Sequence, residues 1–292
     1  MLGLLTPALV SAHSNDVQPG QWNFDPLVTI PLVLISLGYL TGLIRLWHRA
    51  GIGRGVPRWQ VVMFVLGLLT LGGALLSPLE GLGEISFAAH MTQHILLVIV
   101  AAPLMILGKP LAILLLALPG RWRLAVTHNR PVRAMTILAR PVPAMVLYGL
   151  ALWLWHAPLF YQAAIVSNPV HIAEHVVLLV TALLFWWSVI HARRGIGLAG
   201  LFFTMLHNKL LGILIALAPY PLYPVYSAAI NPWGLTAGED QHLAGLIMLI
   251  PGAVVYIAAG LTLLGLWLQA LERRPAALSQ AWLDRPRSGP LS

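Results

Sequence analysis

The chain has 292 residues, of which 59% are hydrophobic and only 9% are charged. A soluble globular chain has about 45–50% apolar and about 25% charged residues, so this chain has too few charges to cover a surface that faces water. Lys and Arg number 17 against nine Asp and Glu, but no basic patch alternates with stacking aromatic residues, which argues against nucleic-acid binding. The composition therefore predicts an all-α, polytopic membrane protein.

The N-terminal apolar run, residues 1–10, is too short to span a bilayer. It is followed by Ser11, Ala12 and His13, which resemble a small-residue cleavage site. No Lys or Arg precedes the run, so a signal peptide over residues 1–12 is only weakly indicated. We expect residues 1–25 to form an outer N-terminal segment.

Seven hydrophobic stretches follow, each near the ~20 residues that cross a bilayer core as a helix. They predict a seven-helix transmembrane domain over residues 26–271 and a disordered cytoplasmic tail over residues 272–292. The apolar run 111–118 is too short to span, and arginines follow it, so we expect it at the membrane interface. The predicted spans are about 26–47, 59–77, 86–107, 142–157, 169–191, 197–218 and 241–270.

Charge alternates between successive loops. Arginines occupy the loops after spans one, three and five and follow span seven, whereas the other loops carry acidic residues such as Asp25, Glu80 and Glu239. Arginine and lysine collect in cytoplasmic loops of membrane proteins. The pattern therefore predicts that the N-terminus is outside and the C-terminus inside.

Two pairs of histidines fall in the outer halves of their spans. His90 and His94 are four residues apart and share one face of span three, and His171, Glu174 and His175 share one face of span five. Neutral imidazole binds copper, zinc and iron, and ionisable groups inside a membrane are costly and mark functional sites. We therefore expect His90, His94, His171 and His175 to form one metal site.

Other polar residues fall near these pairs in the predicted topology. His156 ends span four and His242 begins span seven, both on the outer side. Asp240, like Glu174, could accept the second ring N–H of a ligating histidine and so fix its orientation. His207 and Lys209 lie in the middle of span six, where their role stays open between a hydrogen bond between helices and a functional group.

The kind of site also stays open at this point. The absence of cysteine excludes disulfides, iron–sulfur clusters and thiolate metal sites. Copper held by histidines is one interpretation, and a haem held between His94 and His175 in an electron-transfer protein is another. A copper transporter is a third, but only His207 and Lys209 would line its path at mid-membrane.

Short motifs along the chain resemble those of a known family, the CtaG-like cytochrome c oxidase assembly factors of the caa(3) type. The resemblance covers about residues 22–271. The motifs are WNFDP at 22–26, HMTQH at 90–94, AAPLMILG at 101–108, WHAP at 155–158 with Tyr161, HIAEH at 171–175, FWW at 185–187, and DQHLAGLIM at 240–248 with Pro251 and Gly252.

This resemblance implies a protein of the bacterial plasma membrane that assists the maturation of haem–copper oxidase. The task it implies is copper insertion into subunit I, which makes subunit I and the lipid bilayer the expected partners and an assembly factor more fitting than an enzyme. The positions that match the family's motifs are His90, His94, His171, Glu174, His175, Asp240 and Gln241, with His242 beside them.

Overall fold

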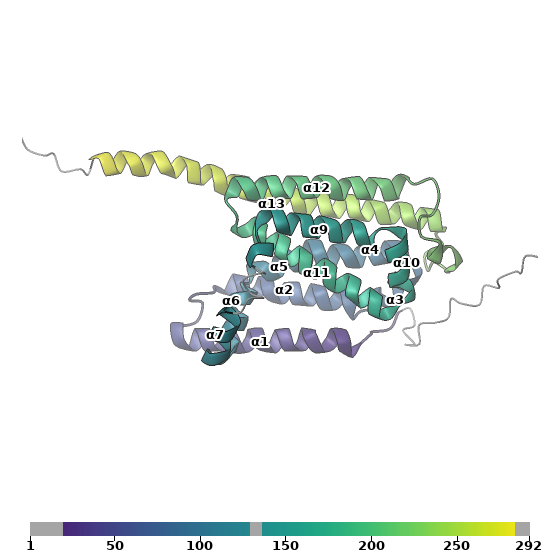
Figure 1. Cartoon of the computed structure of the whole chain (residues 1–292), viewed down its shortest axis with the longest axis horizontal. Coiled ribbons are helices and arrows are strands. Elements are labelled where there is room, and N and C mark those ends of the chain that lie inside the picture. Colours follow the sequence, from purple (N-terminus) through teal and green to yellow (C-terminus); the bar gives the residue numbers. More distant parts are fainter. Residues whose placement is uncertain (1–19, 129–135, 284–292) are drawn as a thin grey trace, which may run out of the picture.

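The computed structural model describes residues 20–128 and 136–283, and these residues form helices and no strand. The expected signal peptide, residues 1–12, lies outside the described residues. Long helices run side by side along one axis, and short helices lie at the two ends of the bundle (Figure 1). The elements are α1 (Pro26–Ala50), α2 (Arg58–Leu75), α3 (Leu79–Ile85), α4 (Phe87–Ile95), η1 (Leu96–Ala101), α5 (Ala102–Leu107), α6 (Pro110–Ala117), α7 (Gly120–His128), α9 (Pro141–Trp155), α10 (Pro158–Val166), α11 (Asn168–His191), α12 (Arg194–Leu217), η2 (Pro224–Ala228) and α13 (Ala237–Leu283).

Six of these helical segments are long and apolar enough to cross a membrane, and the bent pair α9–α10 makes a seventh. The pair bends by 71° at a short break before Pro158. A residue that precedes proline is disfavoured in the helical conformation, and proline itself is favoured at the first helical position, which accounts for this break. The prediction of an all-α protein with seven spans is confirmed, and the outside location of the N-terminus stays a prediction.

The third span consists of α4, the π-helical turn η1 and α5. Pro103, near the start of α5, has no N–H and its ring clashes with the carbonyl four residues earlier in a regular helix, so the wider π turn accommodates it. The Trp186 side chain of α11 donates a 2.9 Å hydrogen bond to the Val98 carbonyl within this turn. Span three is thereby fixed against α11 directly after its two histidines.

The short apolar run 111–118 forms α6, which packs across α1. The backbones come so close that a Cβ atom added to Gly42 would lie 2.0 Å from the Ile113 carbonyl oxygen. Arg45 donates to the Leu116 carbonyl at 3.2 Å, which satisfies part of the C-terminal end of α6. The predicted short, non-spanning segment is therefore anchored to the first span.

The last helix is longer than the sequence predicted. α13 runs from Ala237 to Leu283 and extends past the other helices at one end of the bundle (Figure 1). Residues 272–283, which we expected in a disordered tail, belong to this helix. Residues 284–292 lie outside the described part of the chain.

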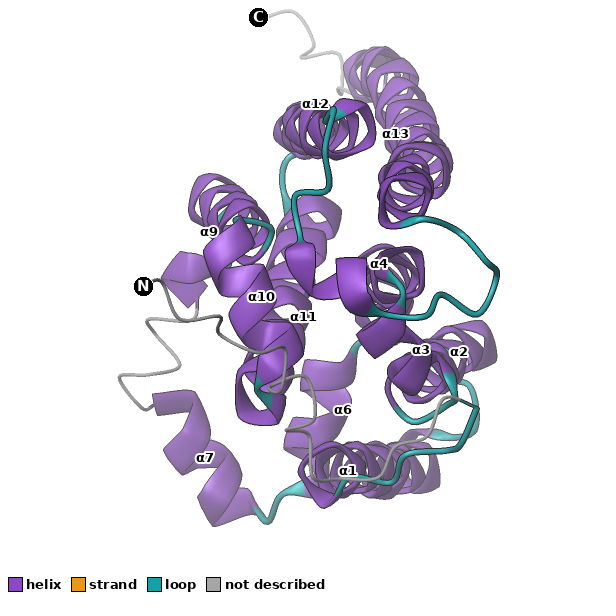
Figure 2. Ribbon diagram, turned by 90° about the vertical axis from the view of Figure 1, so that its right-hand side faces the viewer, coloured by secondary structure: helices purple, strands orange, loops and turns teal. Residues whose placement is uncertain are grey.

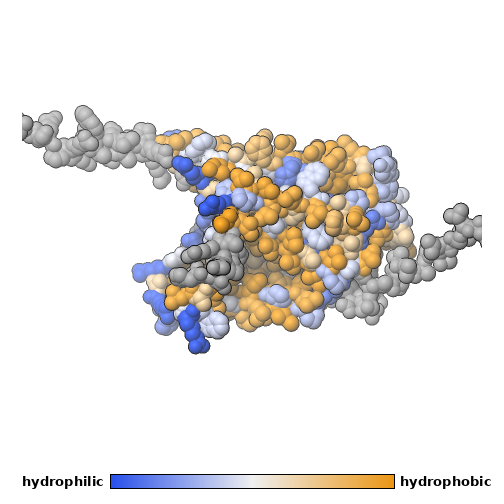
Figure 3. All heavy atoms as spheres, in the orientation of Figure 1, coloured by the Kyte–Doolittle hydropathy of each residue, from blue (hydrophilic) through white to orange (hydrophobic). Residues whose placement is uncertain are grey.

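The helices of the bundle differ in whether they lie at its centre or at its edges. Viewed along the helices (Figure 2), α4 and α11 lie between α1 at one edge and α12 with α13 at the other. Apolar residues cover much of the long side of the bundle, and hydrophilic residues gather at the end where α6 and α7 lie (Figure 3). This arrangement places the histidines of α4 and α11 inside protein, away from the apolar outer surface.

Candidate metal centre

The N-terminus of α4 is held from a distant part of the chain. The Asp240 carboxylate of α13 accepts hydrogen bonds from the Ser86 hydroxyl at 2.8 Å and from the backbone N–H of Phe87 at 2.7 Å. The Ser86 hydroxyl in turn accepts from Ala89 N–H at 3.2 Å. These bonds satisfy N–H groups that the first turn of a helix leaves unpaired, and a negative charge there is favourable. Asp240 therefore fixes the helix that carries His90 and His94.

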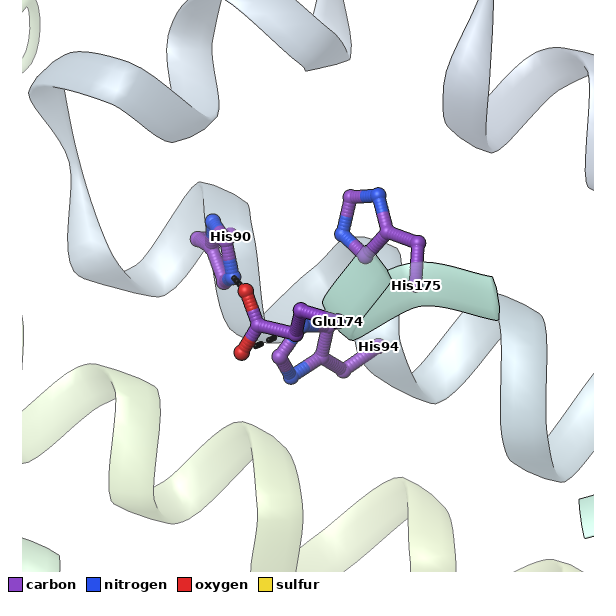
Figure 4. A group of neighbouring side chains, drawn as sticks. All are labelled: His90, His94, Glu174 and His175. Carbon is purple, nitrogen blue, oxygen red and sulfur yellow. Dashed lines mark ion pairs between the residues drawn. The ribbon is translucent and has the colours of Figure 1, made fainter. Parts of the chain in front are cut away.

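Three histidines and one glutamate from α4 and α11 meet in the centre of the bundle. Each of His90, His94, Glu174 and His175 offers a ligand atom within 4.8 Å of the others, and all are buried. The Glu174 carboxylate faces both His90, at 3.5 Å, and His94, at 3.6 Å, as Figure 4 shows. We call these residues the inner group.

Most ligand atoms of the inner group are buried without a hydrogen-bond partner. This holds for both ring nitrogens of His90 and of His94, both carboxylate oxygens of Glu174, and Nε2 of His175. The contacts between His and Glu, at 3.5 and 3.6 Å, are too long to be good hydrogen bonds. Burying polar atoms without partners costs free energy, and a cation bound among them would remove that cost.

A second set of ligands adjoins the first. Glu80, from α3, lies 3.4 Å from Nδ1 of His171, and ligand atoms of Glu80, His171 and His175 lie within 4.8 Å of one another. Burial raises the pKa of the Glu80 carboxyl to about 7, and the hydrogen bond it accepts from Gln93 opposes that rise. We call Glu80, His171 and His175 the outer group; His175 belongs to both groups.

The structure thus brings the predicted ligands together as two adjoining groups. His171 lies next to the inner group, with its ring centroid 5.1 Å from that of His90, but its ligand partner is Glu80. Sequence reasoning placed Glu80 only in an acidic outer loop. The available signal was its position just after Pro78, because proline is favoured at the start of a helix, in a short segment directly before span three.

The remaining candidates lie outside both groups. The ring of His156 lies 5.6 Å from that of His94, while its Nδ1 is 2.7 Å from the Leu152 carbonyl oxygen. His242 contacts the Ala216 carbonyl oxygen at 2.9 Å. Asp240 is the anchor of α4 described above. His156, His242 and Asp240 therefore have partners other than the two groups. Of these three, only His156 contacts a candidate ligand.

Lys209 and Asn208, in the middle of span six, form hydrogen bonds with α13. The Lys209 ammonium donates to the carbonyl of Leu249 on α13. Asn208 donates to the Tyr256 hydroxyl at 2.7 Å. A cavity of about 30 Å³ lies between these residues and His94. Such a volume has room for one or two waters.

The sequence matches the family described as cytochrome c oxidase caa3 assembly factors over residues 37–270. Uncharacterised proteins of Mycobacterium bovis and Mycobacterium tuberculosis are each 26% identical over 244 residues, which cover 77% of this chain and 36% of theirs.

An uncharacterised protein of Mycobacterium leprae is 25% identical over 247 residues, with the same coverage of 77% and 36%. The chain therefore spans little more than a third of the length of these relatives. No solved structure matches it. Because the family match extends over residues 37–270 and includes both groups of ligands, the chain belongs to the cytochrome c oxidase caa3 assembly factor family.

Proposed function

We propose that this protein binds a copper ion with the inner group and delivers it to the haem–copper centre of oxidase subunit I during assembly. The ion is the protein's cargo, and the protein acts as a metallochaperone without catalytic chemistry. The observation that carries the proposal is the set of buried ligand atoms on His90, His94, Glu174 and His175 that have no hydrogen-bond partner. Family membership supplies the oxidase as the client.

The donor set suits copper. Imidazole nitrogen binds copper well, and tetragonal sites of nitrogen and oxygen donors are typical of Cu(II). The Glu174 carboxylate supplies a negative charge in a buried site, where attraction to a cation is much stronger than in water. Zinc takes the same donors, so the identity of the bound metal is the first thing to measure.

The available space favours an ion over haem. Pockets for organic ligands typically have volumes of about 300–1,000 Å³. The cavities beside the histidines are about 30 Å³ next to His94 and about 130 Å³ next to His175. The rings of His94 and His175 lie 5.4 Å apart at 87°, packed against each other with no slot for a macrocycle between them.

The first test is metal and haem analysis of the purified full chain after incubation with copper in detergent. We expect one tightly bound copper ion per chain and no Soret absorption band. A chain that retains no copper after chelation of weakly bound metal would contradict the proposal, as would stoichiometric haem. Stoichiometric zinc in preference to copper would contradict the choice of metal.

The second test measures delivery in a host that assembles the oxidase. Replacing His94 with Ala removes one ligand from the inner group. The ring nitrogens of His94 make no hydrogen bond, so the variant should accumulate at wild-type levels. We expect the oxidase to keep its haem and to lose copper. The matched control is His242→Ala, which removes a histidine outside both groups. An unchanged ratio of copper to haem in the His94→Ala strain would overturn the proposal.

A further inference from the structure

We propose that the outer group, Glu80, His171 and His175, is a second metal position through which copper reaches and leaves the inner group. This inference rests on the copper-binding function proposed above and adds a route to it. Its basis is the arrangement of the two groups, the greater exposure of Glu80, and the closed packing beside His90.

The two positions share a ligand. His175 is within 4.8 Å of ligand atoms in both groups. Its ring centroid lies 4.3 Å from that of His171 and 5.6 Å from that of His90. An ion held by the outer group therefore needs to move only a few ångströms, and it can keep a bond to His175 while its other ligands are exchanged.

Exposure decreases from the outer group to the inner group. The Glu80 side chain is 12% exposed, whereas those of His90 and Glu174 are fully buried. His171 and His94 are similar, at 6% and 5%, so Glu80 is the most accessible ligand of the two groups. A cavity of about 130 Å³ between α1, α2, α3 and α11 is lined mostly by apolar residues, and Glu80, His175, Asp25 and Asn168 are among its polar ones. This cavity gives a cation an approach to the outer group that passes two carboxylates, Asp25 and Glu80.

Packing beside His90 is closed. The Tyr161 ring lies 5.1 Å from that of His90, and its hydroxyl is 2.8 Å from the Tyr226 hydroxyl. Tyr226 donates to the Gly83 carbonyl at 2.9 Å, and Tyr223 donates to the His156 carbonyl at 2.8 Å. All three tyrosines are buried, so an ion would have to break this network to pass there.

Glu80 is held in place for such a role. Gln93, one residue before His94, donates to Glu80 at 2.5 Å and to the Ala74 carbonyl at 3.0 Å. These bonds link the outer carboxylate to the helix that carries the inner histidines. During transfer the ion exchanges Glu80 and His171 for His90, His94 and Glu174, and no electron is gained or lost.

The test compares Glu80→Gln with Glu84→Gln in the full chain purified in detergent. Both changes remove one carboxylate from α3, but Glu84 belongs to neither group. Glutamine keeps the shape of Glu80 and an oxygen that can accept from Gln93. The probe is Cu(II), followed by stopped-flow absorbance for loading and by transfer to a chromophoric chelator for release.

In Glu80→Gln we expect loading and release to slow by about tenfold or more, as for loss of a supporting group in a metal site, with an equilibrium affinity within about twofold of wild type. Glu84→Gln should load at nearly the wild-type rate. Equal rates in wild type and Glu80→Gln would overturn the second position and leave the proposed function standing. Equal slowing in both variants would indicate general attraction by charge and would also overturn it.

A second measurement isolates the outer group. In the double variant His90→Ala, His94→Ala, only the outer group keeps its full set of ligands. We expect weaker binding of one Cu(II), with an electron paramagnetic resonance spectrum of nitrogen and oxygen donors that disappears when Glu80→Gln is added. Failure of the wild type to bind copper at all would refute the proposed function, and no binding by the double variant alone would refute only the second position.

Discussion

Two spans of this protein, Phe87–Leu107 and Ala237–Glu272, are both apolar enough to cross a membrane but have very different surroundings. Of an 18-residue stretch in Phe87–Leu107, 61% is buried inside the protein, against 11% in Ala237–Glu272. The span Phe87–Leu107 carries His90, Gln93 and His94 in its first half, whereas Ala237–Glu272 has its charged residues in its first turn and at its last residue. The polar ligands thus lie on the helix that is surrounded by protein. Lipid cannot form hydrogen bonds with polar groups, so buried polar side chains need partners from the rest of the protein.

The largest effect should come from the histidine that both groups share. His175→Ala removes a ligand from each, and we expect copper affinity to fall by more than about 100-fold, because even loss of an outer-shell partner costs about 10–100-fold. His171→Ala, one turn away on α11, should change affinity far less. Chelator competition measures both. Similar affinities for the two variants would contradict the division into two groups.

The next effect concerns Asp240, a buried anchor that α13 contributes. Asp240→Ala leaves the Ser86 hydroxyl and the Phe87 N–H without their acceptor, so we expect the free energy of unfolding to fall by about 2–3 kcal/mol. Thermal unfolding in detergent measures this change. The control is Glu239→Ala, which lies beside Asp240 but is exposed and should lower the free energy of unfolding less. Equal losses would show that Asp240 is an ordinary cap.

Two glycines on α13 provide a smaller and more local comparison. A Cβ atom at Gly245 would lie 2.7 Å from the Ala216 backbone nitrogen, whereas nothing lies within 4 Å of one at Gly265. We expect Gly245→Ala to cost about 1–3 kcal/mol through overpacking. Gly265→Ala should be neutral or stabilising by up to about 1 kcal/mol, because alanine favours the helix. If Gly265→Ala were destabilising and Gly245→Ala were not, the close contact between α12 and α13 would not lie at Gly245.

The smallest effect is expected on the apolar outer face of the same helix. Leu261 is 64% exposed, so truncation to Ala removes few contacts with protein. The free energy of unfolding should change by less than about 0.5 kcal/mol, as for most substitutions away from packed features. Unfolding in detergent is again the measurement. A loss above about 1 kcal/mol would indicate that another protein chain, rather than lipid, covers this face.

Much of the fold follows from local pattern. The lengths of the apolar stretches determined the spans, and the spacing of His90 with His94 and of His171 with His175 placed each pair on one helical face. α13 continues past the boundary expected at residue 271, because a polar composition indicates poor burial and does not by itself end a helix. The bend at Pro158 shows where proline redirects a span that is too short to cross alone.

What the sequence could not determine is how the helices face one another. Helical periodicity relates residues three or four apart, but the distance between two faces depends on how their helices pack and rotate. Only the tertiary structure places Glu80 beside His171 and makes His175 common to two groups. It also turns Asp240, a candidate ligand partner by sequence, into the anchor of α4, because the close packing of α13 against α4 brings its carboxylate to the helix N-terminus.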